Sequence, residues 1–520
     1  MSKVCVIGAG ASGLPAIKAC LENGLEVVCF ERTTDFGGLW NYRPSQKEGG
    51  TVMASTVEGG TVMASTVVNT SKEMMAYSDF PPPDKWPNFM HHSFVLEYMK
   101  DYAEKFDLLK YVRFNTEVKT VEKVDDQWKI TLENGKFEMF DKVMLATGHH
   151  SIPAYPQFRG IEKFKGRTIH AHDYRSYKGY EGKDVFIVGI GNSALDIAVE
   201  LSKIAKSVTI STRRGSWIFN RCAAGGMPYD IVFHSRLYYF LREILPMNLV
   251  NDFMEHRLQQ RMDHDLFGLR PNHRFFEQHP TVNDALANLL ASGMITVTED
   301  VETFEEKAVI VKGGRRFACD ELILCTGYTF SFPFLKPSNL IPIKDHQVTL
   351  YKFVFPLNDP SIAVIGLIQP IGSVAPISEM QSRWAASLFA GKISLPSITE
   401  MIADIEAKKY AMKQRYFKSP KHTLQVDFVP YMDELAQIIG CKPSLTKTFF
   451  KDFRFFMRLF LGANAPYVYR LDGPNKWDGA KEAIYTLPQR VKLPLKNREC
   501  RTRKHKKRGT LVSFVFKKHV

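Results

Sequence analysis

The chain has 520 residues, more than one hydrophobic core normally holds, so we expect two or more domains. Hydrophobic residues make up 45% of the chain and charged residues 24%, which is the composition of a folded globular protein and excludes a disordered one. The net charge is +14, but residues 496–520 carry ten Lys or Arg against one Glu. The body of the chain is therefore only mildly basic, and this does not favour nucleic acid as a partner.

Eight cysteines are scattered along the chain without a close Cys-x-x-Cys pair. Cys5 and Cys29 fall in predicted buried strands, so we expect free thiols and a reducing compartment. No stretch approaches the roughly twenty apolar residues that are needed to span a bilayer. The sequence therefore predicts no transmembrane helix, and no His/Cys cluster has the spacing of metal ligands.

The chain begins with an apolar strand, a glycine turn, a helix, a second strand and an acid. The strands are predicted over 4–7 and 25–30, the helix over about 14–23, and Glu31 stands 23 positions after Gly8. In this order Gly8 allows a tight turn, Gly10 lets the backbone approach a pyrophosphate, and Gly13 lets the helix pack on the strand. The helix N-terminus attracts phosphate and the acid binds a ribose diol. The predicted contacts of this first dinucleotide site are Gly8, Ala9, Gly10, Ala11, Ser12, Gly13 and Glu31.

Gly37 and Gly38 precede Leu39 and Trp40, which is typical of a loop that passes close over a flat ring system. Then the decapeptide EGGTVMASTV at 48–57 recurs at 58–67. Ten residues are too few for a solenoid unit, so we interpret the repeat as a local duplication that lengthens a loop. The segment Val68-Asn69-Thr70 follows it directly.

A buried strand at 142–145 leads into Ala146-Thr147-Gly148, whose small residues let the chain return close to the first glycine turn. Pro153 and Pro156 then mark a domain exit. Later, strands at 308–312 and 317–324 lead into Cys325-Thr326-Gly327. This second Thr-Gly ending fits a chain that crosses back between two nucleotide domains.

Residues 184–214 repeat the opening plan, with strands at 184–188 and 207–211 and a helix to about 204. The turn between them carries Ala194 in its third place, which the fingerprint tolerates. Arg213 and Arg214 stand where the first unit has its acid, and two guanidinium groups suit a 2′-phosphate. We therefore predict FAD at the first site and NADPH at the second. The predicted NADPH contacts are Gly189, Gly191, Asn192, Ser193, Ala194, Leu195, Asp196, Arg213 and Arg214.

The remaining segments are less informative. A helical insertion is predicted over about 217–300, with amphipathic spacing at 236–245 and 254–266. Further along the chain, a strand is predicted at 362–368 and a helix at 378–388. Small residues and Gln381 near the start of that helix suit flavin contact. Residues 449–463 combine aromatics with Lys451, Arg454 and Arg458 on one helical face; a helix in a membrane interface and a helix packed on the core both stay open. Lys517-Lys518 resemble a dilysine endoplasmic-reticulum retrieval signal.

We therefore expect an α/β fold with two Rossmann-like dinucleotide-binding domains and a helical insertion. Residues 1–153 would form the first part of the FAD-binding domain and residues 331–445 its second part. Residues 154–330 would form the NADPH-binding domain. Residues 446–520 would form a C-terminal amphipathic segment and a basic tail.

With these motifs in order, the chain resembles the flavin-containing monooxygenases of the animal drug-metabolising type, and most of all the fifth isoform type. The likeness runs from residue 3 to about 490. Besides the glycine turns it rests on residues 37–40, 69–75, 89–92, 211–217, 325–328 and 365–370, and on the family pattern FxGxxxHxxxY at Phe164, Gly166, His170 and Tyr174.

The resemblance implies an NADPH- and O2-dependent monooxygenase that transfers one oxygen atom, through a C4a-hydroperoxyflavin, to soft nucleophilic nitrogen or sulfur of small lipophilic, xenobiotic substrates. Asn69 would be the catalytic residue, because a neutral amide hydrogen-bonds without becoming a proton source. Val68, Asn69 and Thr70 would also contact the cofactors. Baeyer–Villiger oxidation of ketones stays open. So do an NADPH oxidase that releases H2O2 and a nucleotide-binding sensor without chemistry, since the duplicated decapeptide could displace Asn69. A disulfide reductase would need a cysteine pair that is not visible. His149, His150, His170 and His172 are interpreted as structural.

The resemblance also implies the cytosolic face of the endoplasmic reticulum membrane. The family's usual hydrophobic C-terminal anchor is replaced here by the basic tail, which leaves anchoring open. A basic tail is typical of a solvated arm or of association with an anionic membrane surface, and we expect surface association. A homo-oligomer stays open.

Overall fold

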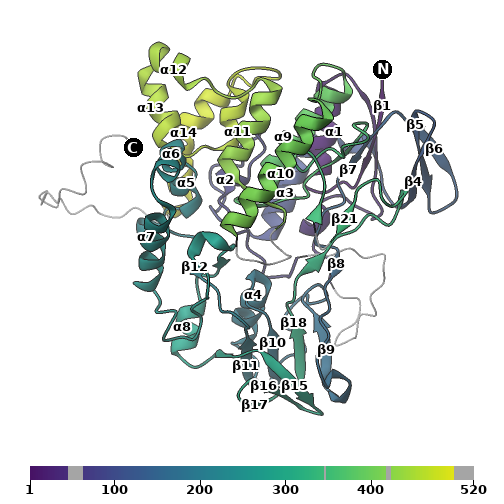
Figure 1. Cartoon of the computed structure of the whole chain (residues 1–520). Coiled ribbons are helices and arrows are strands. Elements are labelled where there is room, and N and C mark those ends of the chain that lie inside the picture. Colours follow the sequence, from purple (N-terminus) through teal and green to yellow (C-terminus); the bar gives the residue numbers. More distant parts are fainter. Residues whose placement is uncertain (45–61, 345–346, 417–422, 497–520) are drawn as a thin grey trace, which may run out of the picture.

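The computed structural model describes residues 1–44, 62–344, 347–416 and 423–496. The first copy of the decapeptide and the basic tail with its paired lysines lie outside these residues. Two five-stranded parallel sheets organise the described chain, one in the upper and one in the lower part of Figure 1. The predicted α/β fold class is confirmed.

The first sheet has the strand order β23-β7-β1-β2-β3, with every pair parallel. Its strands are β1 (Lys3–Ile7), β2 (Glu26–Phe30), β3 (Val112–Arg113), β7 (Lys142–Leu145) and β23 (Ile362–Val364). Val4, Cys5 and Val6 in the central strand are completely buried, as in a sheet covered on both faces. Helices α1 (Gly13–Glu22) and α9 (Val374–Phe389) pack against each other beside this sheet.

The second sheet has the order β14-β11-β10-β18-β9 and is also parallel throughout. Its strands are β9 (Arg167–His170), β10 (Asp184–Val188), β11 (Ser207–Ser211), β14 (Thr296–Thr298) and β18 (Glu321–Leu324). Helix α4 (Asn192–Leu201) follows the central strand β10, just as α1 follows β1. The two sheets are therefore built on the same plan, with β7 and β18 in equivalent places.

Each parallel sheet carries an accessory sheet at the same point of its plan. In the first unit it contains β4 (Val118–Val124), β5 (Gln127–Leu132), β6 (Phe137–Phe140) and β20 (Leu335–Lys336). In the second it contains β15 (Val301–Glu305), β16 (Ala308–Val311) and β17 (Arg316–Ala318). The strand pairs of both accessory sheets are antiparallel, except for the parallel pair β20 and β4 in the first. The strand predicted over 317–324 is thus two strands, because the chain turns at Cys319 and Asp320 to leave one sheet for the other.

The chain passes between the two units twice, and the two crossings lie side by side. Strand β8 (Ile152–Pro153) pairs antiparallel with β19 (Tyr328–Thr329). Next to this pair, Ala154 N donates to Gly327 O at 2.9 Å, and Thr326 Oγ1 donates to Ala154 O at 2.5 Å. Both Thr-Gly endings therefore lead directly into the junction between the units.

The segment 217–300 leaves the second unit and returns to it. Strands β12 (Ile218–Phe219) and β13 (Thr281–Val282) pair and close its base. Its helices are α5 (Tyr229–Phe233), α6 (Arg236–Ile244), α7 (Met247–Gln259) and α8 (Leu286–Ala291). The amphipathic spacing at 254–266 places helix α7 too late in the chain. The helix begins directly after Pro246 and ends at Gln259.

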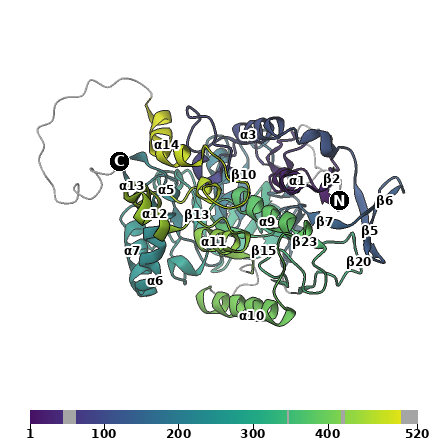
Figure 2. The same cartoon turned by 90° about the horizontal axis from the view of Figure 1, so that it is seen from above.

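The C-terminal part packs on the first sheet and shares its hydrophobic core. Its elements are α10 (Ile398–Arg415), α11 (Phe428–Ile439), α12 (Leu445–Lys451), α13 (Phe453–Leu461) and α14 (Ala480–Lys492). The aromatic stretch is two helices rather than one, because Asp452 breaks it and its side chain caps α13 by accepting from Phe455 N at 3.0 Å. Figure 2 shows α12 and α13 beside α6 and α7 at one edge of the molecule.

The shorter or connecting elements are α2 (Lys72–Met75), α3 (His92–Lys105), β21 (Ile343–Lys344), β22 (Gln347–Val348), β24 (Gln369–Ile371) and β25 (Gln425–Asp427). No described helix is both long and apolar enough to cross a membrane.

Candidate functional site

The first glycine turn lies at the carboxyl end of β1, against the end of β7. Gly8 has φ +102°, and a Cβ there would lie 2.7 Å from Ala146 O. A Cβ at Gly13 would lie 1.8 Å from Gly8 O. Both positions therefore require glycine: Gly8 for its positive φ and its contact with the next strand end, and Gly13 for the contact between helix and turn.

The Gly37-Gly38 loop folds over this turn. Gly37 N donates to Ala9 O at 3.0 Å, and a Cβ at Gly38 would lie 3.2 Å from Gly10 Cα. Leu39 and Trp40 follow in a short 3-10 turn, η1 (Gly38–Trp40), and are partly buried. The structure thus brings the predicted ring-facing loop onto the predicted pyrophosphate turn.

The strand predicted over 362–368 is shorter than expected, and its end closes the first turn. Strand β23 stops at Val364, and Gly366 has φ +79°. A Cβ on Gly366 would lie 2.2 Å from Ser12 Oγ, which itself donates to Ser378 Oγ at 3.0 Å. Gln381 Oε1 accepts from Gly366 N at 2.8 Å, and its Nε2 donates to Tyr431 Oη at 2.9 Å. Gln381 is completely buried and orients Gly366.

Glu31 lies at the end of β2, next to the glycine turn. Its Oε2 accepts from Ala9 N at 2.8 Å, and its Oε1 accepts from Thr33 N and Thr33 Oγ1 at 2.9 and 2.7 Å. The carboxylate is therefore buried beside the turn in a fixed orientation. The place beside the turn is the one that the spacing predicts, and contact with a ribose diol stays a prediction.

The second glycine turn repeats the first against the end of β18. Gly189 has φ +123°, and a Cβ there would lie 2.4 Å from Cys325 O. No atom of the described residues lies within 4 Å of a Cβ built on Gly191, so this turn is open where the first is covered. Asn192 Oδ1 accepts from Val282 N at 2.8 Å, while Ser193 is partly buried and Ala194 and Leu195 are buried in α4.

Arg213 and Arg214 lie directly beyond β11, and both are exposed. Asp196 lies one turn into α4, and its Oδ1 accepts from Asn283 Nδ2 at 3.4 Å. Burial raises the pKa of Asp196 to about 6, although nearby Arg221 opposes that shift. The two arginines and Asp196 therefore all lie close to the second glycine turn.

Neither α1 nor α4 has a side-chain cap at its N-terminus or an acid in its first turn. Anions are stabilised at such helix ends by the free N–H groups and the helix dipole. The glycine turns, the uncapped helices and Glu31 therefore fit a dinucleotide with a free ribose diol at the first site. Arg213 and Arg214 fit a 2′-phosphate at the second.

Asn69 lies on a loop that is held in place on both sides. Val68 N donates to Met90 O at 2.9 Å, and His92 N donates to Thr66 O at 3.0 Å. Val68 is buried, and Asn69 and Thr70 are partly buried. Val62 N and Ala64 N, from the second decapeptide copy, donate to Leu39 O at 3.0 Å and Arg175 O at 2.9 Å. The described part of the second copy therefore makes the contacts that lead into Asn69.

Arg221 reaches this loop from the segment beyond β11. Its Nη2 donates to Asn69 Oδ1 at 2.8 Å, and its Nη1 donates to Asp284 Oδ2 at 2.7 Å. The guanidinium also donates to the carbonyls of Val67 and Val68, each at 3.3 Å. Asn69 is thus joined to the second unit by a residue that no motif in the sequence marked.

The first Thr-Gly ending, Thr147-Gly148, is exposed beside the first turn. His149 follows it and hydrogen-bonds the Gly366 backbone; burial is the main reason why its pKa is lowered to about 3. His170 is completely buried and its Nδ1 accepts from His172 N at 3.0 Å. These contacts suit structural histidines. No three His, Cys, Asp or Glu side chains of the described chain form a group that could hold a metal ion.

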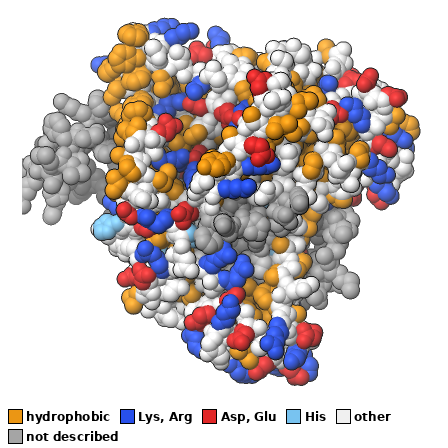
Figure 3. Space-filling view, viewed as in Figure 1, with side chains coloured by type: hydrophobic (Ala, Val, Ile, Leu, Met, Phe, Trp, Pro, Cys, Tyr) orange, Lys and Arg blue, Asp and Glu red, His pale blue; other side chains and the backbone are white. Residues whose placement is uncertain are grey.

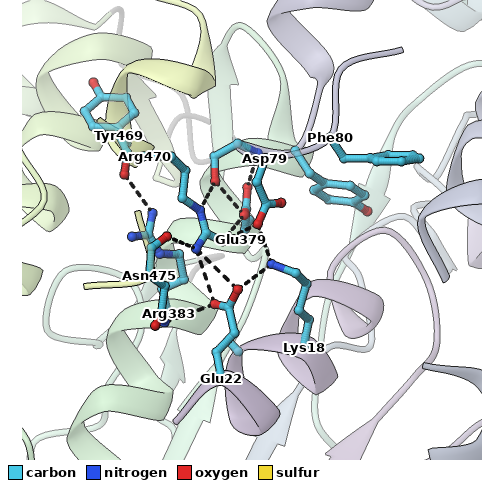
Figure 4. Close-up of polar contacts among 12 residues, drawn as sticks. Lys18, Glu22, Asp79, Phe80, Glu379, Arg383, Tyr469, Arg470 and Asn475 are labelled. Carbon is cyan, nitrogen blue, oxygen red and sulfur yellow. Dashed lines mark hydrogen bonds and ion pairs between the residues drawn. The ribbon is translucent and has the colours of Figure 1, made fainter. Parts of the chain in front are cut away.

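A buried ion network lies behind the first site (Figure 4). Arg470, 1% exposed in its side chain, pairs with Glu379 of α9 at 2.9 Å, with Asp79 at 3.2 Å and with Glu22 of α1 at 3.3 Å. Lys18 of α1 pairs with Asp79 at 2.6 Å. The network fixes α1 and α9, the two helices that flank the first turn, against each other and against the C-terminal part.

Comparisons with known proteins point to one family. A family model described as flavin-binding monooxygenase-like matches residues 1–518. Flavin-containing monooxygenase 5 of Homo sapiens is 47% identical over 509 residues, which cover 95% of this chain and 93% of that protein. The N-oxide-forming dimethylaniline monooxygenase 2 of Mus musculus is 44% identical over 528 residues, with 99% and 96% covered.

Solved structures show the same fold at lower identity. S-allyl-L-cysteine S-oxygenase from Allium sativum matches with a TM-score of 0.63 at 23% identity, over 95% of this chain and 99% of that one. An open crystal structure of cyclohexanone monooxygenase matches with a TM-score of 0.63 at 17% identity, over 84% and 98%.

The match over nearly the whole chain confirms the predicted family, the predicted enzyme class and the predicted cofactor pair. The chain belongs to the flavin-binding monooxygenase-like family, and it is an NADPH- and O2-dependent flavin monooxygenase that uses FAD and NADPH.

Proposed function

We propose that the protein transfers one oxygen atom from O2 to soft nucleophilic nitrogen or sulfur atoms of small lipophilic substrates, xenobiotics among them. Bound FAD and NADPH supply the redox chemistry, and the chain binds, orients and shields them. In this proposal residues 1–153 and 331–445 hold FAD, residues 154–330 hold NADPH, and the contacts are those predicted from the sequence. Asn69 is the catalytic residue.

The hydrogen bond between Arg221 and Asn69 carries the proposal. It fixes the amide with its oxygen toward Arg221, so the N–H donors of Asn69 are turned away from Arg221. An amide N–H can hold an oxygen species without giving up a proton, which suits a site that must not release peroxide. Arg221 is also paired with Asp284, so its charge is compensated. A soft nucleophile takes oxygen from a neutral donor, whereas attack on a ketone needs an anionic one, which an uncompensated cation would stabilise. The compensated cation therefore favours nitrogen and sulfur.

The test is a competition between two substrates. The purified protein receives NADPH, O2, a thioether and a cyclic ketone, and the products and the H2O2 are quantified. We expect sulfoxide to exceed ester, and we expect Asn69→Ala to divert NADPH consumption from sulfoxide to H2O2. Ester as the main product would establish Baeyer–Villiger oxidation instead. One H2O2 per NADPH in the native protein would establish an oxidase.

We further propose that one edge of the molecule attaches the enzyme to the cytosolic face of the endoplasmic reticulum membrane. Helix α6 contacts α13, and large apolar side chains are exposed there and on the adjoining helices α7 and α12. They are Phe240, Ile244, Leu249, Phe253, Phe449, Phe450 and Phe453, with Phe450 80% exposed. Figure 3 shows hydrophobic side chains gathered over α12, α13 and α6 along the left edge. Lys451 and Arg454 lie among them, and aromatics flanked by cations suit an anionic lipid surface.

Vesicle sedimentation tests this attachment. Anionic phospholipid vesicles should bind the native protein, and replacing Phe450 and Phe453 by Ser should weaken binding while the flavin spectrum stays unchanged. Replacing exposed Phe137, on the distant accessory sheet, by Ser is the matched control. Unchanged sedimentation of the double variant, or a dimer formed through this edge in solution, would contradict the proposal.

A further inference from the structure

A short hairpin over residues 221–230 leads out of the second unit, and its last two residues are the first two of helix α5. Cys222 and Pro228 form an antiparallel bridge. Ala223 N donates to Met227 O at 2.7 Å, and Tyr229 N donates to Arg221 O at 2.9 Å. These bonds bring the two ends of the hairpin together, so Arg221 and Asp230 are held at a fixed separation.

Both ends of this hairpin bond to the Asn69 loop, one on each side of Asn69. Arg221 donates to the carbonyls of Val67 and Val68 and to the Asn69 side chain. At the other end, Asp230 Oδ2 accepts from Ser71 N at 2.6 Å. The hairpin therefore holds the loop at two points that flank Asn69.

The Ser71 N–H is one of the free donors at the start of α2. Ser71 is the N-cap of that helix and makes no side-chain cap hydrogen bond of its own. Such donors need an acceptor when they are buried, and Ser71 is completely buried. Asp230 supplies it from 159 residues further along the chain. The cap thus joins α2, and Asn69 before it, to the helical segment of the second unit.

The rest of α2 is fixed from the C-terminal side. Glu73 is completely buried, with its Oε2 accepting from Arg490 Nη2 at 2.6 Å and from Tyr467 Oη at 2.9 Å. Lys72 Nζ donates to the carbonyls of Pro83, Asp84 and Trp86. Because α2 itself is immobilised in this way, the contacts of the hairpin act together with the backbone bonds of Thr66 and Val68 to place the preceding loop.

We propose that Asp230 is a positioning residue for oxygen transfer, which holds Asn69 in its working place through the Ser71 backbone N–H. The inference rests on the proposed function of Asn69. A carboxylate in this place is costly: burial raises the pKa of Asp230 to about 6, although hydrogen bonds from Ser71 oppose the shift. The presence of a buried acid here is explained if the acceptor is needed at this point.

The decisive measurement is the ratio of H2O2 released to NADPH oxidised, with a thioether present. Asp230→Ala should raise this ratio about tenfold, the factor that corresponds to one charge-assisted hydrogen bond. Asp230→Asn keeps an oxygen acceptor for Ser71 N and should stay near the native ratio. FAD content and the KM for NADPH should not move in either variant, because Asp230 contacts neither glycine turn. Asp252→Ala on exposed α7 is the matched control and should leave all three readouts unchanged.

Asn69→Ala and the double variant separate the inference from its premise. If Asn69→Ala raises the ratio and Asp230→Ala does not, the role of Asp230 is wrong and that of Asn69 stands. If Asn69→Ala leaves the ratio unchanged, both are wrong. If both raise it, the double variant should be no worse than the worse single one, since both act on one group; independent, multiplying effects would overturn the inference. Should Asp230→Ala fail to fold, Asp230→Glu replaces it. It keeps the charge but displaces the oxygen, and a native ratio in it would also overturn the inference.

Discussion

The two glycine turns share one plan but differ in how the chain surrounds them. At the first, Gly38 lies over Gly10, Gly366 lies against Ser12, and α9 packs on α1. At the second, the space beside Gly191 is open and the arginines beyond β11 are exposed. The same strand-turn-helix unit is therefore closed in one copy and accessible in the other.

This difference corresponds to two ways of using a dinucleotide. A cofactor that stays bound through many turnovers gains from a site that several chain segments close around it. A cosubstrate that must enter and leave gains from an open turn with a charged recognition edge. The closed copy suits FAD and the open copy suits NADPH. The four experiments that follow test this contrast.

The largest effect is expected at the third position of the turns. Gly13→Ala would place a Cβ 1.8 Å from Gly8 O, which the buried turn cannot relieve, and overpacking of this kind costs about 1–3 kcal/mol or more. We expect purified protein with little flavin, measured as the ratio of visible to ultraviolet absorbance. The matched change Ala194→Gly should keep its flavin and lose about 1 kcal/mol of stability. A yellow Gly13→Ala protein would contradict the closed geometry.

The next effect concerns the arginines at the open turn. Replacing Arg213 and Arg214 by Ala should lower the ratio of kcat/KM for NADPH to kcat/KM for NADH by about 10–100-fold. The reason is that hydrogen bonds to charged groups contribute about 1.5–3 kcal/mol. Steady-state kinetics with both nucleotides measures the ratio. Arg315→Ala, at an exposed turn of the accessory sheet, is the control. An unchanged preference in the double variant would refute the assignment.

A smaller effect is expected at Gly191. Nothing within 4 Å obstructs a Cβ there and its φ of −78° is ordinary, so Gly191→Ala should fold and keep its flavin. A bound pyrophosphate would meet the added methyl group, so the KM for NADPH should rise a few-fold, about 1 kcal/mol. A normal melting temperature with an unchanged KM would show that the backbone of this turn does not approach the nucleotide.

The smallest effect is a pH dependence at Asp196. Because burial raises its pKa to about 6, the folded state binds its proton more tightly than the unfolded state does. Its contribution to stability is therefore greatest at low pH and falls as the pH rises through 6. Asp196→Asn lacks this pH-dependent contribution. We therefore expect the melting temperature of the variant, minus that of the native protein, to be higher at pH 7.5 than at pH 4.5, each about 1.5 units from the raised pKa. A constant difference would contradict the raised pKa.

Local patterns predicted the frame of the molecule well. The central strands are a good example: β10 and β11 have the predicted bounds, and the turns follow them directly. The reason is physical, since an apolar strand that runs into a glycine turn leaves few other conformations. The residues predicted at both turns also lie together, and Glu31 reaches the first turn as its spacing requires.

What the sequence did not reveal depends on contacts between distant segments. Arg221 and Asp230 stand in no motif, and only the folded hairpin shows that both reach the Asn69 loop. The flavin contact of Gln381 stays a prediction, and its amide bonds to Gly366 N and Tyr431 Oη, partners that no spacing could indicate. In the aromatic segment the helical spacing of hydrophobic residues continues across Asp452 without interruption. The helix nevertheless ends there, because the Asp452 side chain caps the start of α13.

The Arg470 network has a consequence for how the enzyme is made. Arg470 follows its partner Glu22 by 448 residues, so at about 5–20 residues per second a ribosome needs roughly 20–90 s to supply the second member of the pair. Until then, among the residues that the structure describes, Glu22 has only Lys18 of the same helix as its cationic partner. The complete set of ion pairs behind the first turn therefore forms only after the last tenth of the chain has begun to emerge.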